Sequence, residues 1–117
     1  MPAQFQIEQR LDYYAFTFTS DDQCILFFSR LYTSIQDCKR GIAALQLCVA
    51  APACFEKAEV KGEHSFFIRT KKGELLGHSI VFFAGSSRDF GIRKISREAA
   101  YARIVEPVHF QDQAFAV

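Results

Sequence analysis

The chain carries one pattern of residue types twice, at an offset of fifty residues. The matched positions include Phe5 with Phe55, Phe16 with Phe66, Ile25 with Leu75 and Gly41 with Gly91. The register runs without a gap from residue 5 to residue 50, and turn signals coincide as well, since Asp22-Gln23 aligns with Lys72-Gly73. A unit of about fifty residues is too short to close a stable core alone, so two such units are expected to share one.

We therefore expect a single pseudo-twofold domain over residues 1–117. The first repeat covers about 4–53, the second covers about 54–110, and 111–117 form a C-terminal tail. Hydrophobic residues make up 50% of the chain, which excludes an intrinsically disordered protein.

Each repeat opens with three strand patterns. In the first repeat they cover 5–9, 14–19 and 24–28, and in the second 55–60, 65–70 and 74–79. Phe16 and Phe18 alternate with small or polar residues, which predicts a half-buried strand. The stretch 24–28 is continuously apolar and predicts a strand at the centre of the sheet. Gly62 and Gly73 fall in turns, where a positive φ is expected.

A helical period follows the strands in both repeats. In the first repeat one stripe joins Ile35, Cys38, Ile42, Leu45 and Val49. Thr33 or Ser34 is the expected N-cap there, and Ser86 in the second repeat. Both helices contain a glycine, Gly41 and Gly91, and glycine costs a helix about 1 kcal/mol relative to alanine. We interpret these glycines as sites where the helix backbone packs closely on the sheet or on the other helix. The stretch 102–110 contains Pro107 and predicts an edge strand.

The two units resemble the YegP-like family of small uncharacterised bacterial proteins. The resemblance covers about 4–105 and rests on 29–34 and Gly41-Ile42 in the first unit and on 79–82 and Gly91-Ile92 in the second. It implies an α+β fold with a single antiparallel sheet, built from two intertwined β3-α-β repeats with exchanged terminal strands and two helices on one face. The turn Asp22-Gln23, where the family usually carries Asn-Gly or Asp-Gly, marks a divergent member. The family has no established activity, so the resemblance implies no cofactor and no catalytic residue.

Composition and motifs also predict no enzyme. The chain lacks a glycine-rich phosphate loop and the motifs of serine hydrolases and zinc proteases. The formal net charge of +1 gives no overall field that would attract nucleic acid or acidic lipid. No apolar run is long enough to span a membrane and the N-terminus does not read as a secretory signal, so we expect a cytoplasmic protein.

Four cysteines lie in the first half of the chain without CxxC spacing. In a reducing compartment such cysteines are expected to be small buried hydrophobic residues. The histidines lie in the second half, so we expect no metal site. The cysteines are Cys24, Cys38, Cys48 and Cys54, and the histidines are His64, His78 and His109.

Aromatic residues make up 15% of the chain, more than the alternating core positions require. Helices on one face of a sheet leave the other face open, and a large exposed apolar patch usually marks an interface. We therefore expect an interaction or structural module whose partner is a second copy of the chain, with another protein as the alternative partner. The interface candidates are Phe27, Phe28, Phe67, Phe82 and Phe83.

Two other functions stay open on particular residues. Single-stranded nucleic acid could bind the basic second repeat through Arg69, Lys71, Lys72, Arg93 and Arg97. A small ligand could bind the seam between the repeats through Ser29 and Ser79, which correspond at the offset of fifty. The commoner role of a serine at the end of a strand is to satisfy a nearby backbone group.

Overall fold

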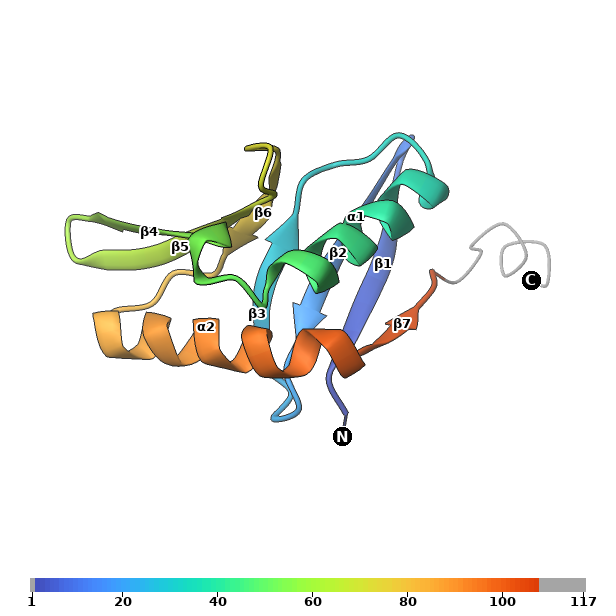
Figure 1. The fold of residues 1–117 in the computed structure, drawn as a ribbon. Helices are drawn as coiled ribbons and strands as arrows, with labels where there is room; N and C mark the ends of the chain where they lie inside the picture. Colours follow the sequence, from blue (N-terminus) through green and yellow to red (C-terminus); the bar gives the residue numbers. More distant parts are fainter. Residues whose placement is uncertain (1, 108–117) are drawn as a thin grey trace.

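Seven strands and two helices make up the fold in this computed structural model, which describes residues 2–107. Along the chain come β1 (Gln4–Arg10), β2 (Tyr13–Thr19), β3 (Ile25–Ser29), α1 (Ile35–Cys48), β4 (Phe55–Val60), β5 (Glu63–Arg69), β6 (Leu75–Ser79), α2 (Gly85–Glu98) and β7 (Arg103–Val105). Short 3₁₀ turns at Pro52–Cys54 and Ala99–Tyr101 follow the two helices. The order β-β-β-α therefore occurs twice, and the elements agree with the predicted ranges (Figure 1).

The strands form one sheet in the order β4-β5-β6-β3-β2-β1-β7. β3 and β6 pair antiparallel at its centre, and their register places Phe28 opposite His78. β7 pairs with β1 in parallel, so the sheet is mixed and the prediction of a purely antiparallel sheet is wrong. The reason is the route of the chain, because α2 returns it to the far edge of the sheet and a helical connection permits a parallel pair.

β7 begins within the predicted strand at 102–110 and ends at Val105, before Pro107. Residues 108–110 of that predicted strand and the predicted tail at 111–117 lie outside the described residues.

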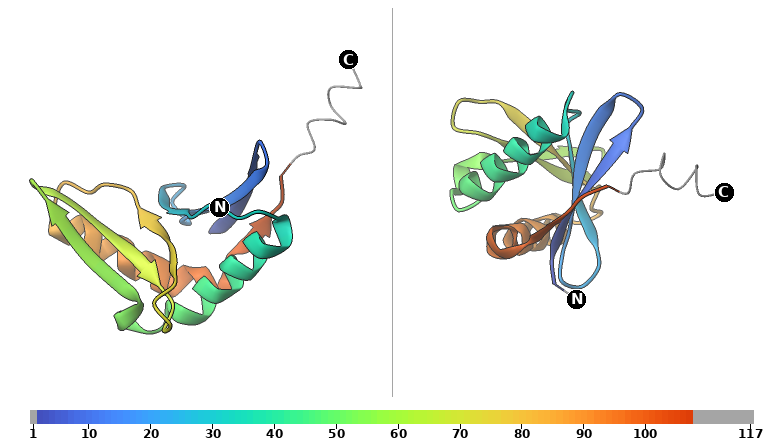
Figure 2. Two further views of the ribbon diagram at one scale, coloured as in Figure 1. Left: turned by 90° about the horizontal axis from the view of Figure 1, so that it is seen from above. Right: turned by 90° about the vertical axis from the view of Figure 1, so that its right-hand side faces the viewer.

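Both helices cover the same side of the sheet (Figure 2). The core between the helices and the sheet contains Phe5, Phe16, Phe18 and Phe66, all with no exposed surface, as the alternating pattern predicts. Phe5 meets Phe16 edge to face, with centroids 5.6 Å apart, and meets Phe18 tilted; Phe66 meets Phe55 edge to face. The helices contribute Cys38, Gly41, Ile42, Leu45 and Cys48 from α1 and Gly91, Lys94 and Ile95 from α2.

A bulge in each central strand explains the continuous apolar run predicted at 24–28. Phe18 lies opposite Phe27 and Thr19 opposite Ile25, so Leu26 is one extra residue in β3. A bulge brings the extra side chain and its neighbour to the same side of the sheet. Leu26 and Phe27 are both buried for this reason. β6 repeats the arrangement, since Ile68 lies opposite Gly77 and Arg69 opposite Leu75.

The two helices begin differently. Ser34 caps α1, because its hydroxyl accepts a hydrogen bond of 3.1 Å from the backbone N–H of Asp37. The prediction of Ser86 as the second cap is wrong, because α2 begins at Gly85 and its N-cap is Ala84, which has no capping side chain. The first turn of α2 therefore lacks the side-chain acceptor that stabilises α1.

The helix glycines lie against aromatic rings. A β-carbon on Gly41 would be 2.1 Å from the hydroxyl oxygen of Tyr32, and one on Gly91 would be 2.9 Å from Cζ of Phe82. This confirms the predicted close packing, with the difference that the partner is the segment just before each helix. Each ring also stacks on a core phenylalanine, with centroids 6.3 Å apart for Tyr32 on Phe16 and 6.3 Å apart for Phe82 on Phe66.

Candidate functional site

The face of the sheet away from the helices carries an aromatic row at its centre. Because side chains alternate along a strand, Phe28 points away from the face that buries Phe27. The Phe28 and His78 rings lie 5.8 Å apart, between β3 and β6. Backbone pairing extends the row across six strands as Gln6, Thr17, Phe28, His78, Phe67 and Glu56.

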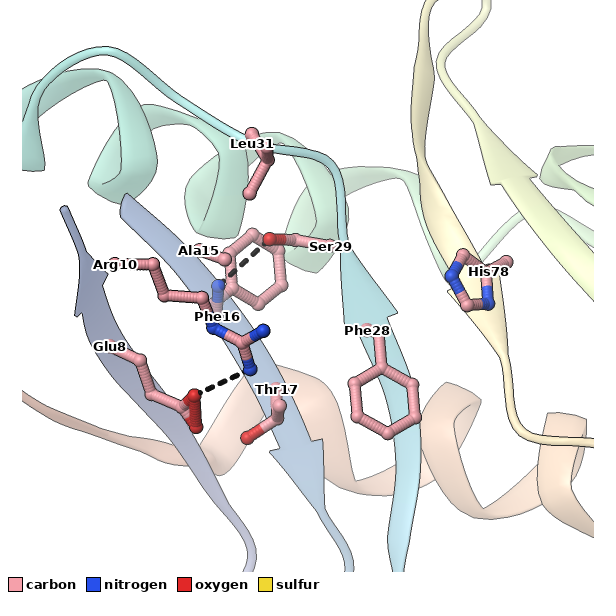
Figure 3. A pocket seen from close by; sticks show the side chains of 9 residues that line it. All are labelled: Glu8, Arg10, Ala15, Phe16, Thr17, Phe28, Ser29, Leu31 and His78. Carbon is pink, nitrogen blue, oxygen red and sulfur yellow. Dashed lines mark hydrogen bonds and ion pairs between the residues drawn. The ribbon is translucent and has the colours of Figure 1, made fainter. Parts of the chain in front are cut away.

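A shallow hollow of about 330 Å³ lies in the first half of this face (Figure 3). Phe28 and His78 line one side of it, and Glu8 and Arg10 line the other. Arg10 donates a hydrogen bond of 2.9 Å to Glu8, so this end of the face carries an ion pair. We name the row together with this hollow the open face.

The opposite end of the open face also carries an ion pair. Arg69 donates from Nε to Glu56 over 2.8 Å and from its terminal nitrogen to the carbonyl oxygen of Gly73 over 3.2 Å. The centre of the face is therefore aromatic, and each end holds one acid and one base. Opposite charges balance at both ends.

Two of the five predicted interface residues lie on the open face, Phe28 and Phe67, and both are half-buried. Phe27 is fully buried among the core side chains, because it lies opposite the buried Phe18, so it has no surface to offer a partner. Phe82 is half-buried against Phe66. Phe83 is 82% exposed but precedes α2, away from the row.

Thr17 and His78 belong to the row but were not among the predicted interface residues. The offset of fifty could have identified them, because antiparallel pairing of β3 with β6 sets Phe28 against its own counterpart, His78. Thr17 is the counterpart of Phe67 in the same way.

The two predicted ligand serines bind the backbone. The hydroxyl of Ser29 accepts from the N–H of Phe16 over 2.8 Å and donates to the carbonyl of Arg30 over 2.7 Å. The hydroxyl of Ser79 accepts from Phe66 over 2.9 Å and donates to Ile80 over 2.7 Å. Each serine thus replaces a ladder hydrogen bond at a strand end, and each hydroxyl proton is already used. Their role toward a ligand stays a prediction.

The predicted basic residues line different parts of the surface. Lys71 and Lys72 lie in the β5–β6 turn beside α1, where they line a groove with Leu47. Arg93 lines another groove, between α2 and the β2–β3 turn. Arg69 belongs to the open face, and Arg97 is exposed in the last turn of α2. Only Arg69 therefore lies on the face that carries Phe67.

Three of the four cysteines are buried as predicted, and Cys24 is exposed because it lies in the β2–β3 turn. Burial raises the pKa of the Cys38 thiol to about 11 and that of the Cys48 thiol to about 12. Among residues 2–107, no three histidine, cysteine or acidic side chains gather as metal ligands. No helix in this range is long and apolar enough to cross a membrane.

Two solved structures share this architecture. The solution structure of yegP from E. coli, a protein of unknown function, superposes with a TM-score of 0.85 at 20% identity, covering 93% of this chain and 97% of that chain. The solution structure of a UPF0339 protein from Shewanella oneidensis superposes with a TM-score of 0.84 at 18% identity, covering 91% of this chain and 92% of that chain. This chain has the YegP-like fold.

The resemblance predicted from the sequence is thus confirmed for the fold. No protein-family profile matches the chain, and no curated protein matches it. The shared fold carries no activity across to this chain.

Proposed function

We propose that this protein is a non-enzymatic interaction module that associates with a second copy of itself through the open face. The observation that carries the proposal is the row of Phe28, His78 and Phe67, flanked by the buried Thr17, on a sheet face that neither α1 nor α2 covers. Aromatic side chains at the centre of a surface, with charged groups at its rim, are the usual anatomy of a protein interface.

Symmetry and charge favour a second copy as the partner. Positions fifty residues apart lie on the two sides of the Phe28–His78 pair, so the two halves of the face correspond. A surface of this kind can pair isologously with itself, which is the commonest form of homodimer. Each end carries both signs of charge, in Glu8 with Arg10 and in Glu56 with Arg69, so two copies can meet without net repulsion.

The same symmetry supports a tandem-repeat origin for the fold. In this interpretation β1–β3 with α1 form one unit and β4–β6 with α2 form the other. β7 follows the second unit in the chain but pairs with β1, so in this interpretation the second unit contributes a strand to the first. A second copy on the open face then extends an arrangement that already joins two units within one chain.

Binding rather than catalysis is supported by the state of the nucleophilic side chains. The hydroxyl groups of Ser29 and Ser79 each donate one hydrogen bond to the backbone and accept one from it. Cys38 and Cys48 are buried with raised pKa values, which disfavours the reactive thiolate. Nucleic-acid binding at the same face has less support, since Arg69, its predicted cation beside Phe67, is already paired with Glu56.

Light scattering over a range of protein concentrations tests the proposal. The wild type should approach twice the chain mass of 13.3 kDa as its concentration rises. Phe28→Thr with Phe67→Thr should hold the mass at the monomer value, because threonine keeps strand propensity but removes the rings. Phe67→Thr also copies Thr17, the residue at the corresponding position.

Phe83→Ser is the matched control, since Phe83 is exposed but lies off the open face. It should dimerise as the wild type does. A wild type that stays monomeric at high concentration, or a loss of association in Phe83→Ser alone, refutes the proposal.

A further inference from the structure

A groove along α1 is lined by four cations, three of which form no ion pair with the described residues. It consists of two adjoining hollows, of about 440 Å³ and about 670 Å³, which share Ala44 and Glu74 in their walls. The first is lined by Arg30, Tyr32, Asp37 and Arg40 among others, and the second by Leu47, Cys48, Lys71 and Lys72 among others. We name these two hollows the α1 groove. It lies on the helix side of the molecule and shares no wall with the aromatic row of the open face.

The cations of the α1 groove are only partly engaged. Arg40 pairs with Asp37 over 2.7 Å, and the guanidinium of Arg30 lies 4.8 Å from the centroid of the Tyr32 ring. Arg30, Lys71 and Lys72 form no ion pair with any of residues 2–107. With Asp37 and Glu74 as its acids, the groove has a formal charge of +2 (four cations against two carboxylates).

The corresponding groove along α2 shows that the fold does not require this charge. In the other repeat, the positions fifty residues away from the four cations hold different residue types. Ile80 corresponds to Arg30, Phe90 to Arg40, Asp21 to Lys71 and Asp22 to Lys72. The cations are replaced by two apolar residues and two acids.

The cation at the centre of the α2 groove is neutralised by acids of the fold. Lys94, at the position of Ala44, is 9% exposed and pairs with Asp21 and, over 2.9 Å, with Glu98. The backbone N–H of Asp21 donates to Glu98 over 2.9 Å as well. Arg93 also lines the α2 groove and forms no ion pair within residues 2–107. Because the acids Asp21, Asp22 and Glu98 outnumber the cations Arg93 and Lys94, the α2 side lacks the excess of positive charge that the α1 groove has.

We infer that the α1 groove binds an acidic peptide segment with an apolar anchor residue. Arg30, Arg40, Lys71 and Lys72 supply cations for carboxylates, and arginine in particular binds a carboxylate through two parallel hydrogen bonds. Leu47 is 83% exposed and supplies the apolar contact between the two lysines and Ala44. Tyr32 lines the first hollow, and its hydroxyl is buried against Gly41 rather than open to the hollow.

The lining favours a peptide over single-stranded nucleic acid. Bases bind such grooves by stacking on exposed rings, and Tyr32, the aromatic residue of the groove, is only 6% exposed beneath Arg30. Asp37 and Glu74 stand among the cations and would repel a continuous phosphate backbone. A peptide can place its carboxylates at the cations and its apolar side chain at Leu47.

Fluorescence anisotropy with a short labelled peptide of alternating glutamate pairs and leucines tests this inference. The peptide should bind at low salt, and raising the salt should weaken it because the attraction is screened. Lys71→Glu with Lys72→Glu should weaken binding by about tenfold or more, since like charges then face the peptide. Arg30→Ser with Arg40→Ser should do the same from the other hollow.

The matched control reverses two exposed arginines of α2, as Arg93→Glu with Arg97→Glu, and should leave the affinity unchanged within about twofold. Circular dichroism must show every variant folded. The inference is overturned if the peptide does not bind at low salt, if the α2 variant weakens it as strongly, or if labelled oligothymidine binds and the peptide does not. Because neither Lys71 nor Lys72 lines the open face, the association state of Lys71→Glu with Lys72→Glu should match the wild type.

Discussion

The ring of Phe27 lies directly against Gly77, at the centre of the sheet. A β-carbon on Gly77 would be 2.6 Å from Cζ of that ring and 2.2 Å from the carbonyl oxygen of Phe28. These two residues occupy corresponding positions at the offset of fifty, and the core holds a side chain from only one of them. Gly77→Ala should therefore destabilise the protein by about 3 kcal/mol, because neither a fully packed ring nor the backbone can move aside cheaply.

Urea unfolding measures this loss. Gly85→Ala is the control, since its β-carbon would lie 3.5 Å or more from its neighbours, and it should leave stability equal or higher. Equal stability of Gly77→Ala and the wild type would mean that Phe27 does not pack as described.

Gly41→Ala should destabilise the protein, against the helix propensity of alanine. The new methyl group would meet the Tyr32 hydroxyl at 2.1 Å, so the ring stacked on Phe16 must shift. We expect a loss of about 2 kcal/mol, and a smaller loss of about 1 kcal/mol for Gly91→Ala, where the closest ring atom of Phe82 is 2.9 Å away. Thermal unfolding ranks the two variants, and a higher melting temperature for Gly41→Ala would contradict the packing.

Acid should weaken the contact between α2 and the β2–β3 turn. The hydrogen bond with Lys94 lowers the pKa of Asp21 below its ordinary value of 3.8. A lowered carboxyl pKa stabilises the fold above the unfolded value, and that stability is lost as pH falls through the folded value. Hydrogen bonds to Asp21 and Glu98 raise the pKa of Lys94 above 10.5, so its contribution is present below that pH and is lost above it.

Melting temperatures from about pH 7 down to about pH 3 measure the acid side. The wild type should lose stability mainly below about pH 4, and Lys94→Met should show a smaller loss over the same interval, because Asp21 then keeps an ordinary pKa in the folded state. An unchanged pH dependence in Lys94→Met would show that this ion pair does not stabilise the fold.

The cysteines should differ in reactivity toward a thiol reagent. Cys24 is exposed in its turn, whereas Cys38, Cys48 and Cys54 are buried. Burial also raises the pKa of Cys38 and of Cys48, so their thiolates are scarce at neutral pH. A colorimetric disulfide reagent should therefore titrate one thiol quickly in the native protein and four after unfolding. Cys24→Ser should abolish the quick phase, and a quick phase that persists in this variant would contradict the burial pattern.

Local patterns in the sequence predict most of the fold. The alternation around Phe16 and the stripe from Ile35 to Val49 set the strands and helices, because both depend on residues close together in the chain. The bulge at Leu26 and the N-cap of α2 at Ala84 were not predicted. The bulge depends on the neighbouring strand, and the start of α2 depends on packing that outweighs the missing side-chain cap.

The candidate sites depended on pairing between distant residues. Phe28 and Phe67 were predicted as interface residues together with Phe27, because a continuous apolar run does not reveal which side of the sheet each residue takes. The α1 groove was not predicted, since Arg30 and Lys72 are brought to the same groove only by the tertiary fold. The turn lysines were instead grouped with α2, which carries most of the other basic residues of the second repeat.

The most direct test of the open face is its protection from a soluble paramagnetic agent in proton NMR spectra. The ring signals of Phe28, Phe67 and His78 should be broadened in dilute protein and protected at high concentration, where a second copy covers the face. Phe83, which lies off the face, should be broadened at both concentrations. Equal broadening of the Phe28 and Phe83 rings at high concentration would show that the face stays bare and would contradict self-association through it.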